Sequence, residues 1–108
     1  MVRERRLRKA LTMLESHIPR TVREMAKGVC LSPTYLQRLF KRETGVHVSD
    51  LLAEHRLQKA AHLLAESDLS IKQIAYAVGY KHQSSFVRAF ERRFSLPPTI
   101  YRRQAAGA

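Results

Sequence analysis

The chain has 108 residues, of which 44% are hydrophobic, a balance that supports a packed core and disfavours wholesale disorder. Lysine and arginine number 20 against 9 acidic residues, and the resulting net charge of +11 favours a polyanionic partner, such as nucleic acid or an anionic membrane surface. The alternative is a basic, soluble surface with no polyanionic partner. No apolar run approaches the ~18 residues of a membrane span, and the basic N-terminus lacks the apolar core of a secretory signal. We therefore expect a cytoplasmic protein that does not span a membrane.

Helical periodicity dominates the chain, and no convincing alternating strand pattern occurs, so we predict an all-α fold of about seven helices. Pro19 ends the first helix. Thr21 and Glu24 then form the capping box of a short second helix, which runs to about Lys27 and ends at Gly28. The apolar face of the first helix has spacings of 4, 3 and 4 residues and consists of Leu7, Leu11, Leu14 and Ile18.

The third helix lies in LSPTYLQRLFKRETG, residues 31–45. Ser32 is its predicted N-cap, Pro33 occupies the first helical position, and Gly45 closes it. A longer helix follows from about Val48 to Glu66, and at ~1.5 Å per residue it is roughly 28 Å long.

A second capping box, Ser70 and Gln73, opens another short helix, which ends in a turn at residues 78–80. A longer helix is predicted from about Gln83 to Phe94. Residues 97–103 then form a last turn or two of helix, and residues 104–108 are predicted to be a frayed tail.

The two halves of the chain repeat each other. The capping boxes lie 49 residues apart, and equivalent residues keep that offset up to the turn, beyond which it becomes 50. Each half therefore has a short helix, a tight turn and a second helix, which is the helix-turn-helix plan. The equivalent pairs are Val22 and Ile71, Met25 and Ile74, Ala26 and Ala75, Val29 and Val78, Leu31 and Tyr80, Leu36 and Phe86, Arg38 and Arg88, Phe40 and Phe90, and Arg42 and Arg92.

The second helix of the first repeat has a polar outer face. At ~100° per residue, with Leu36 at the centre of the buried side, five polar residues point outward. Arginine can bind guanine and glutamine can bind adenine as bidentate partners in a major groove, whereas cations further along suit phosphates. The alternative is an ordinary solvated face. We predict base contacts from Thr34, Gln37 and Arg38, and phosphate contacts from Lys41 and Arg42.

The second repeat has an equivalent face. Val87 suits a thymine methyl group, and Gln83 can reach base edges from the first helical turn. Glu91 stands where Lys41 stands in the first repeat, and a carboxylate is repelled by phosphate, so we hypothesise weaker binding by the second repeat. We predict base contacts from Gln83, Ser84, Val87 and Arg88, and phosphate contacts from Arg92 and, near helix starts, from Arg20 and Lys72.

These segments resemble the AraC/XylS family of bacterial transcription regulators. The matching blocks are LSPTYLQRLFKRETG, HRLQKAAHLLAES, IKQIAYAVGYKHQSSFVRAF and PPTIYR, and the resemblance covers residues from about 5 to 103. It implies two helix-turn-helix subdomains, about 5–46 and 67–103, joined by the long central helix in 47–66. It also implies that one helix of each subdomain enters successive major grooves on one face of double-stranded DNA.

The resemblance further implies regulation of transcription, with a leaning toward activation and RNA polymerase as a partner. Many family members carry an N-terminal sensor or dimerisation domain, which this chain does not include, so it is a stand-alone regulator or part of a longer one. Three positions depart from the family pattern at caps and turns: His47, His82 and Ser95. The family's base-contact positions correspond to Thr34, Gln37, Arg38, Gln83, Ser84 and Arg88.

An enzyme is the first rival class. His55 and His62 share a face of the long helix with Glu66, but the i, i+4 step of a tight helical metal pair is missing. Cys30 is the only cysteine, which excludes an intramolecular disulfide and a Cys-based zinc site. We interpret it as a small core residue, with a reactive thiol as the alternative. We predict that the protein is not an enzyme and needs no cofactor or metal.

Three binding alternatives remain. The chain could be a helical interaction module without DNA binding, although the outward polar faces argue against it. The basic N-terminal helix could bind a membrane surface. RNA binding is disfavoured because the aromatic residues occupy mostly core spacings rather than an exposed stacking platform. Those residues are Tyr35, Phe86, Phe90 and Phe94.

Overall fold

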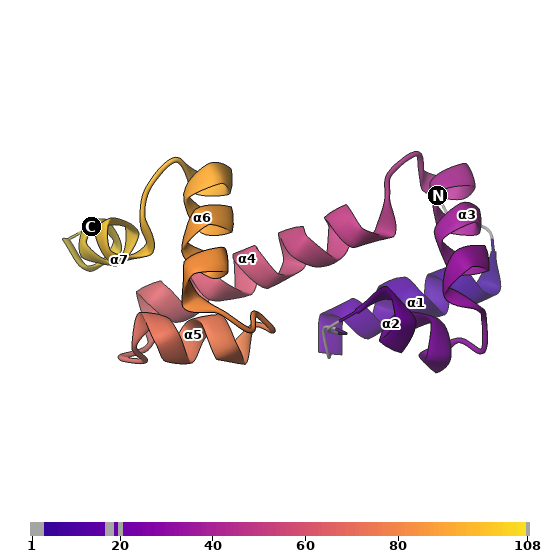
Figure 1. Ribbon diagram of the computed structural model, residues 1–108, viewed down its shortest axis with the longest axis horizontal. Coiled ribbons are helices and arrows are strands. Elements are labelled where there is room, and N and C mark those ends of the chain that lie inside the picture. Colours follow the sequence, from indigo (N-terminus) through magenta and orange to yellow (C-terminus); the bar gives the residue numbers. More distant parts are fainter. Residues whose placement is uncertain (1–3, 17–18, 20, 108) are drawn as a thin grey trace. The chain divides into compact units, whose positions relative to one another are not determined.

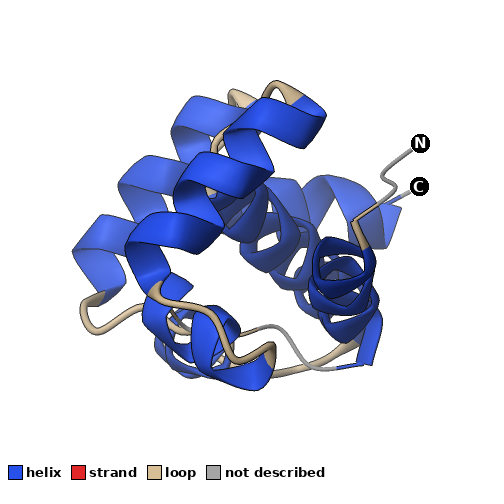
Figure 2. Ribbon diagram, turned by 90° about the vertical axis from the view of Figure 1, so that its right-hand side faces the viewer, coloured by secondary structure: helices blue, strands red, loops and turns tan. Residues whose placement is uncertain are grey.

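The computed structural model describes residues 4–16, 19 and 21–107 (Figure 1). In that part of the chain it has seven helices and no strand, which confirms the predicted all-α fold (Figure 2). Ile18 and Arg20, two residues singled out above, lie outside the described residues. The helices are α1 (Arg5–Ser16), α2 (Val22–Gly28), α3 (Pro33–Thr44), α4 (Val48–Glu66), α5 (Ile71–Ala77), α6 (Gln83–Phe94) and α7 (Pro98–Gly107).

The chain forms two compact units that divide between residues 55 and 56, inside α4. α2 packs against α3 in the first unit, and α5 packs against α6 in the second, so each unit contains one helix-turn-helix. Each also has its own buried core: α4 supplies Val48 and Leu52 to the first and Leu57 and Leu64 to the second. The long helix predicted from about Val48 to Glu66 is confirmed as α4, and its residues belong to both cores.

Local hydrogen bonds fix both ends of α3. The Ser32 hydroxyl oxygen accepts from the backbone N–H of Tyr35 at 3.1 Å, and Pro33 occupies the first turn. At the other end, Gly45 has a φ of 79° and its N–H donates to the Lys41 carbonyl oxygen at 2.9 Å. A left-handed residue suits glycine because it has no Cβ. These caps confirm the predicted start and end of α3.

The second unit repeats the caps with two differences. Ser70 and Gln73 form a complete capping box, with bonds of 3.0 and 2.8 Å between each side chain and the other's backbone N–H. α6 (Gln83–Phe94), however, is preceded by His82 at the N-cap, whose side chain makes no capping hydrogen bond. The residue after the last turn of α6 is Ser95, which has a left-handed φ of 62° where Gly45 stands in the first unit. Both departures weaken the ends of α6 relative to those of α3.

The turn of the first unit contradicts the core interpretation of Cys30. Its side chain is exposed and its φ is 58°. Gly79 takes the equivalent place in the second unit, with a φ of 101°. Val29, the residue before Cys30, is buried in the core instead. The turn thus needs a left-handed residue at this point, and the left-handed geometry directs the cysteine side chain to solvent.

Aromatic side chains fill the core of the second unit. Phe90 lies 5.7 Å from Phe86, 4.5 Å from Phe94 and 5.3 Å from Tyr101, measured between ring centroids. Tyr80, in the turn, lies 5.6 Å from Phe86, and burial raises the pKa of its hydroxyl. These contacts join the turn, α6 and α7. They confirm Phe86 and Phe90 as core residues, whereas Phe94 is partly buried and packs against that core.

The last helix is longer than the sequence pattern predicts. We expected a frayed tail from residue 104, whereas α7 continues to Gly107. Within α7, the Arg102 guanidinium donates to the carbonyl oxygens of Leu64 at 3.0 Å and Ser67 at 3.2 Å. Arg102 therefore caps the C-terminal end of α4, where carbonyl groups have no helical partners.

Candidate nucleic-acid interface

The core orients α3. Leu36, Leu39 and Phe40 are at most 2% exposed, so this side of the helix is fixed against α1 and α2. Because a helix turns by ~100° per residue, side chains on the opposite side of α3 point away from this core. The predicted base-contact residues Thr34, Gln37 and Arg38 are all exposed there.

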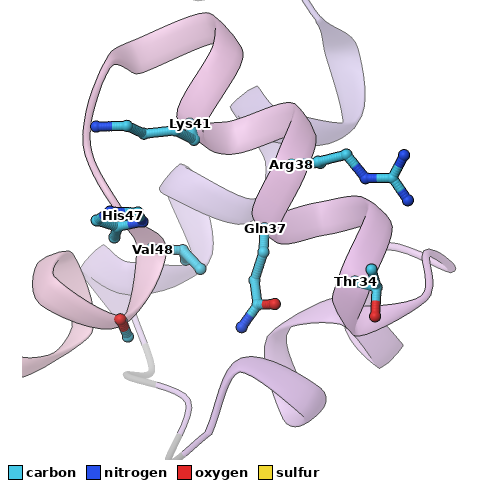
Figure 3. A pocket seen from close by; sticks show the side chains of 7 residues that line it. Thr34, Gln37, Arg38, Lys41, His47 and Val48 are labelled. Carbon is cyan, nitrogen blue, oxygen red and sulfur yellow. The ribbon is translucent and has the colours of Figure 1, made fainter.

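Those three side chains belong to a shallow hollow of about 420 Å³ in the first unit. Figure 3 shows it between α3 and the beginning of α4, with Thr34 and Arg38 on one side of α3 and Lys41 on the other. The sequence predicted the contribution from α3. It did not predict that the first residues of α4 close the hollow, because that depends on how α4 packs against the core. The lining consists of Thr34, Gln37, Arg38, Lys41, His47, Val48 and Ser49.

Lys41, predicted to bind phosphate, has a second role. Its ammonium group donates to the Gly45 carbonyl oxygen at 2.6 Å. A cation at this end of a helix also interacts favourably with the helix dipole. Lys41 remains exposed, so its charge contributes to the outer face of α3 while its position is fixed by the cap.

α6 presents an equivalent surface in the second unit. A hollow of about 570 Å³ is lined by Gln83, Ser84, Val87 and Arg88, the four residues predicted to contact bases there. Val87 is half-buried and packs against the aromatic core, so only part of its side chain can meet a ligand. The arrangement combines an amide, a hydroxyl, a methyl surface and a guanidinium, which together can bind both polar and apolar base edges.

The remaining predicted phosphate contacts are placed as follows. Arg42 lies near the end of α3, Arg92 near the end of α6 and Lys72 in the first turn of α5, and all three are exposed. Glu91 is exposed on α6 as well. Arg20 lies outside the described residues.

The structure also bears on two rival features, a metal site and a membrane-spanning helix. Among the described residues no group of three or more histidine, cysteine or acidic side chains could hold a metal ion. A ring nitrogen of His55, Nδ1, lies 3.0 Å from the Leu51 carbonyl oxygen of the same helix. In the same part of the chain, no helix is both long enough and apolar enough to span a bilayer.

Comparisons with known proteins agree with this geometry. A family model described as a helix-turn-helix domain matches residues 25–104. A solved structure from Chromobacterium violaceum, described as a transcriptional regulator with an AraC-type DNA-binding domain, superposes with a TM-score of 0.79. It is 32% identical and the match covers 94% of this chain and 92% of that one. The chain belongs to the AraC-type helix-turn-helix family.

Two further relatives support the assignment. The AraC-type domain is 40% identical over 99 residues to the transcriptional regulator GlxA of Rhizobium meliloti, covering 92% of this chain but 30% of that protein. It also superposes on the DNA-binding domain of AdpA in complex with a target DNA, with a TM-score of 0.80, 25% identity and coverage of 94% and 93%. The chain spans about a third or less of the first curated relatives. It is thus a DNA-binding domain of the kind found in transcriptional regulators.

Proposed function

We propose that this AraC-type domain binds double-stranded DNA sequence-specifically by placing α3 and α6 in adjacent major grooves. The observation that carries the proposal is the repeated surface: each unit sets an exposed glutamine and arginine around a hollow on its second helix. A net charge of +11 adds attraction to phosphate. A solvated face without a function has no reason to repeat the same residue types in both units.

The roles of the individual side chains follow from their chemistry. Arg38 and Arg88 can each donate two parallel bonds to guanine O6 and N7, and Gln37 and Gln83 can pair with adenine N6 and N7. The smaller Thr34, Ser84 and Val87 fill the remaining base-edge contacts. Phosphates are assigned to Arg20, Lys41, Arg42, Lys72 and Arg92.

The two-groove arrangement also draws on the length of α4. Its 19 residues correspond to ~28 Å, which approaches the ~34 Å between successive major grooves. One chain would then bind an asymmetric site without a symmetric partner.

The experiment is in vitro selection of the 108 residues on a random duplex library at near-physiological salt. Enrichment of two unlike blocks about one helical turn apart would support two reading helices. A single enriched block would leave only one unit as a specific reader. No enrichment, with binding that disappears as salt rises, would reduce the interaction to electrostatics and contradict the proposal.

Transcriptional activation is the remaining part of the proposal. Bound beside a promoter in the cytoplasm, the domain would contact RNA polymerase, and an N-terminal sensor or dimerisation domain would supply the response to an effector. The test is in vitro transcription from a promoter that carries the selected site. More transcript with the domain supports activation, and less transcript indicates repression instead.

A further inference from the structure

The start of α1 carries a compact cluster of charges. The Glu4 carboxylate accepts from the backbone N–H of Arg6 at 2.7 Å and from the Arg6 guanidinium at 3.2 Å, through Nε, and 3.1 Å, through Nη2. These bonds with Arg6 lower the pKa of the Glu4 carboxyl. The side chains remain accessible, with exposed fractions of 46% for Arg6 and 21% for Glu4.

The same guanidinium lies over an aromatic ring of α3. The central carbon of the Arg6 guanidinium is 5.8 Å from the centroid of Tyr35, within the range of a cation–π contact. Tyr35 is 40% exposed, which contradicts its assignment to a core spacing. Its exposed ring instead contacts the Arg6 guanidinium of α1 beside the polar face of α3.

The cluster lies along one flank of that face. With Leu36 at 0°, Tyr35 falls at about 260° and Arg42 at about 240°, next to Arg38 at about 200°. The Arg42 charge also contributes to the lowered pKa of Glu4, because the two groups are close. Lys41, at about 140°, lies toward the opposite flank. Since a major groove is bordered by two sugar–phosphate strands, each flank of a bound helix faces one of them.

From these contacts, and resting on the proposed DNA binding, we propose that Arg6 contacts the DNA phosphate backbone on the Arg42 flank of α3. Glu4 is then a built-in competitor for that phosphate. A carboxylate and a phosphate are both anionic oxygen acceptors that guanidinium binds through paired N–H groups. Glu4 uses two of the five N–H groups of Arg6, and a phosphate can bind the others or replace it.

The test compares three single substitutions in the full chain. Arg6→Gln removes the proposed contact, and Glu4→Gln removes the competing charge while keeping an oxygen that can accept the helix-capping bond. Arg8→Gln is the matched control, because it removes the same charge from a different side of α1. With Leu7 at 0° on the wheel of α1, Arg8 lies at about 100° and Arg6 at about 260°. Affinity is measured for a selected duplex and for a scrambled duplex over a series of salt concentrations.

Arg6→Gln should weaken binding to both duplexes by about fivefold to tenfold at 0.1 M salt and lower the salt slope by about one unit. Glu4→Gln should strengthen binding to both duplexes by about twofold or more. Arg8→Gln should leave the salt slope within about 0.3 of the wild-type value. Circular dichroism of each variant should match that of the wild-type chain, which checks that its helices are kept.

The proposal is overturned if Arg6→Gln loses no more affinity than Arg8→Gln, or if Glu4→Gln fails to strengthen binding. Failure of the proposed function looks different, because the wild-type chain itself would then not bind DNA. Loss of specificity in Arg38→Ala, together with unchanged binding in Arg6→Gln, would retain the DNA-binding function and reject only this contact.

Discussion

Arg38 is exposed on α3 beside Gln37 and presents a guanidinium with two parallel donors to solvent. Because a bidentate contact to guanine specifies one base pair, Arg38→Ala should weaken binding to the selected site by ~1–3 kcal/mol and relax specificity at that position. Measured affinities for a panel of single-base variants of the site check this. An equal loss on every duplex would contradict the assigned role.

Lys41 should behave in the opposite way. Removing an exposed cation assigned to phosphate should weaken binding to all sequences about equally and lower the salt slope by about one unit. The measurement is the affinity of Lys41→Ala for the selected and a scrambled duplex as salt is varied. Since Lys41 also bonds the Gly45 carbonyl oxygen, thermal denaturation must accompany it. A loss of affinity for the selected duplex alone would indicate that Lys41 contacts a base rather than a phosphate.

Glu91 is opposite in charge to Lys41, its equivalent in the first repeat. It is exposed on α6 where α3 carries Lys41, and a carboxylate near phosphate opposes binding. Glu91→Lys should therefore raise affinity for all duplexes and increase the salt slope by about one to two units, as a negative charge is replaced by a positive one. Unchanged affinity and slope in a salt titration would place this part of α6 away from DNA.

At the scale of an element, the two repeats place glycine at different left-handed positions. The first unit has Cys30 in its turn and Gly45 after α3, whereas the second has Gly79 in its turn and Ser95 after α6. All four residues have positive φ. Each unit thus has one non-glycine residue in the left-handed conformation, which costs a residue with a Cβ ~1–2 kcal/mol.

Cys30→Gly should consequently stabilise the first unit by about 0.5–1 kcal/mol. The relief of left-handed strain exceeds the extra ~0.5–1 kcal/mol of chain entropy that glycine loses on folding. Urea unfolding measures the difference, and Gly79→Ala is the matched control, expected to destabilise the second unit. A destabilised Cys30→Gly would mean that the cysteine side chain makes contacts worth more than the strain.

The helices show which features a sequence can predict. α3, α4 and α6 have the predicted bounds. For α3 the reason is local, because Ser32, Pro33 and Gly45 act within a few positions of the helix ends. The outward direction of Arg38 and Arg88 was predictable because it needs only the helical period. The core interpretation of Cys30 was wrong because a left-handed turn residue directs its side chain to solvent. Tyr35 lies about 100° away from Leu36 on the helical wheel, so its exposure needed only the helical period. The contact of Arg102 with α4 spans more than 30 residues, so no local pattern indicates it.

At the scale of the whole molecule, the two buried cores are separate although α4 runs through both. Phe40 belongs to the first core and Phe90 to the second, at equivalent positions, and both are at most 1% exposed. Removing a buried phenylalanine side chain typically destabilises a protein by ~3–5 kcal/mol. If the cores are independent, that loss should fall mainly on the unit that contains the substitution.

Amide hydrogen exchange resolves this directly. Phe90→Leu, milder than alanine, should reduce the protection of α5, α6 and α7 and leave α1, α2 and α3 close to wild type, and Phe40→Leu should do the reverse. The two halves of α4 should differ, with faster amide exchange only in the half that packs on the altered core. An equal loss of protection in both units would show that α4 couples them into one cooperative structure, in which case weakening either recognition helix would weaken the other as well.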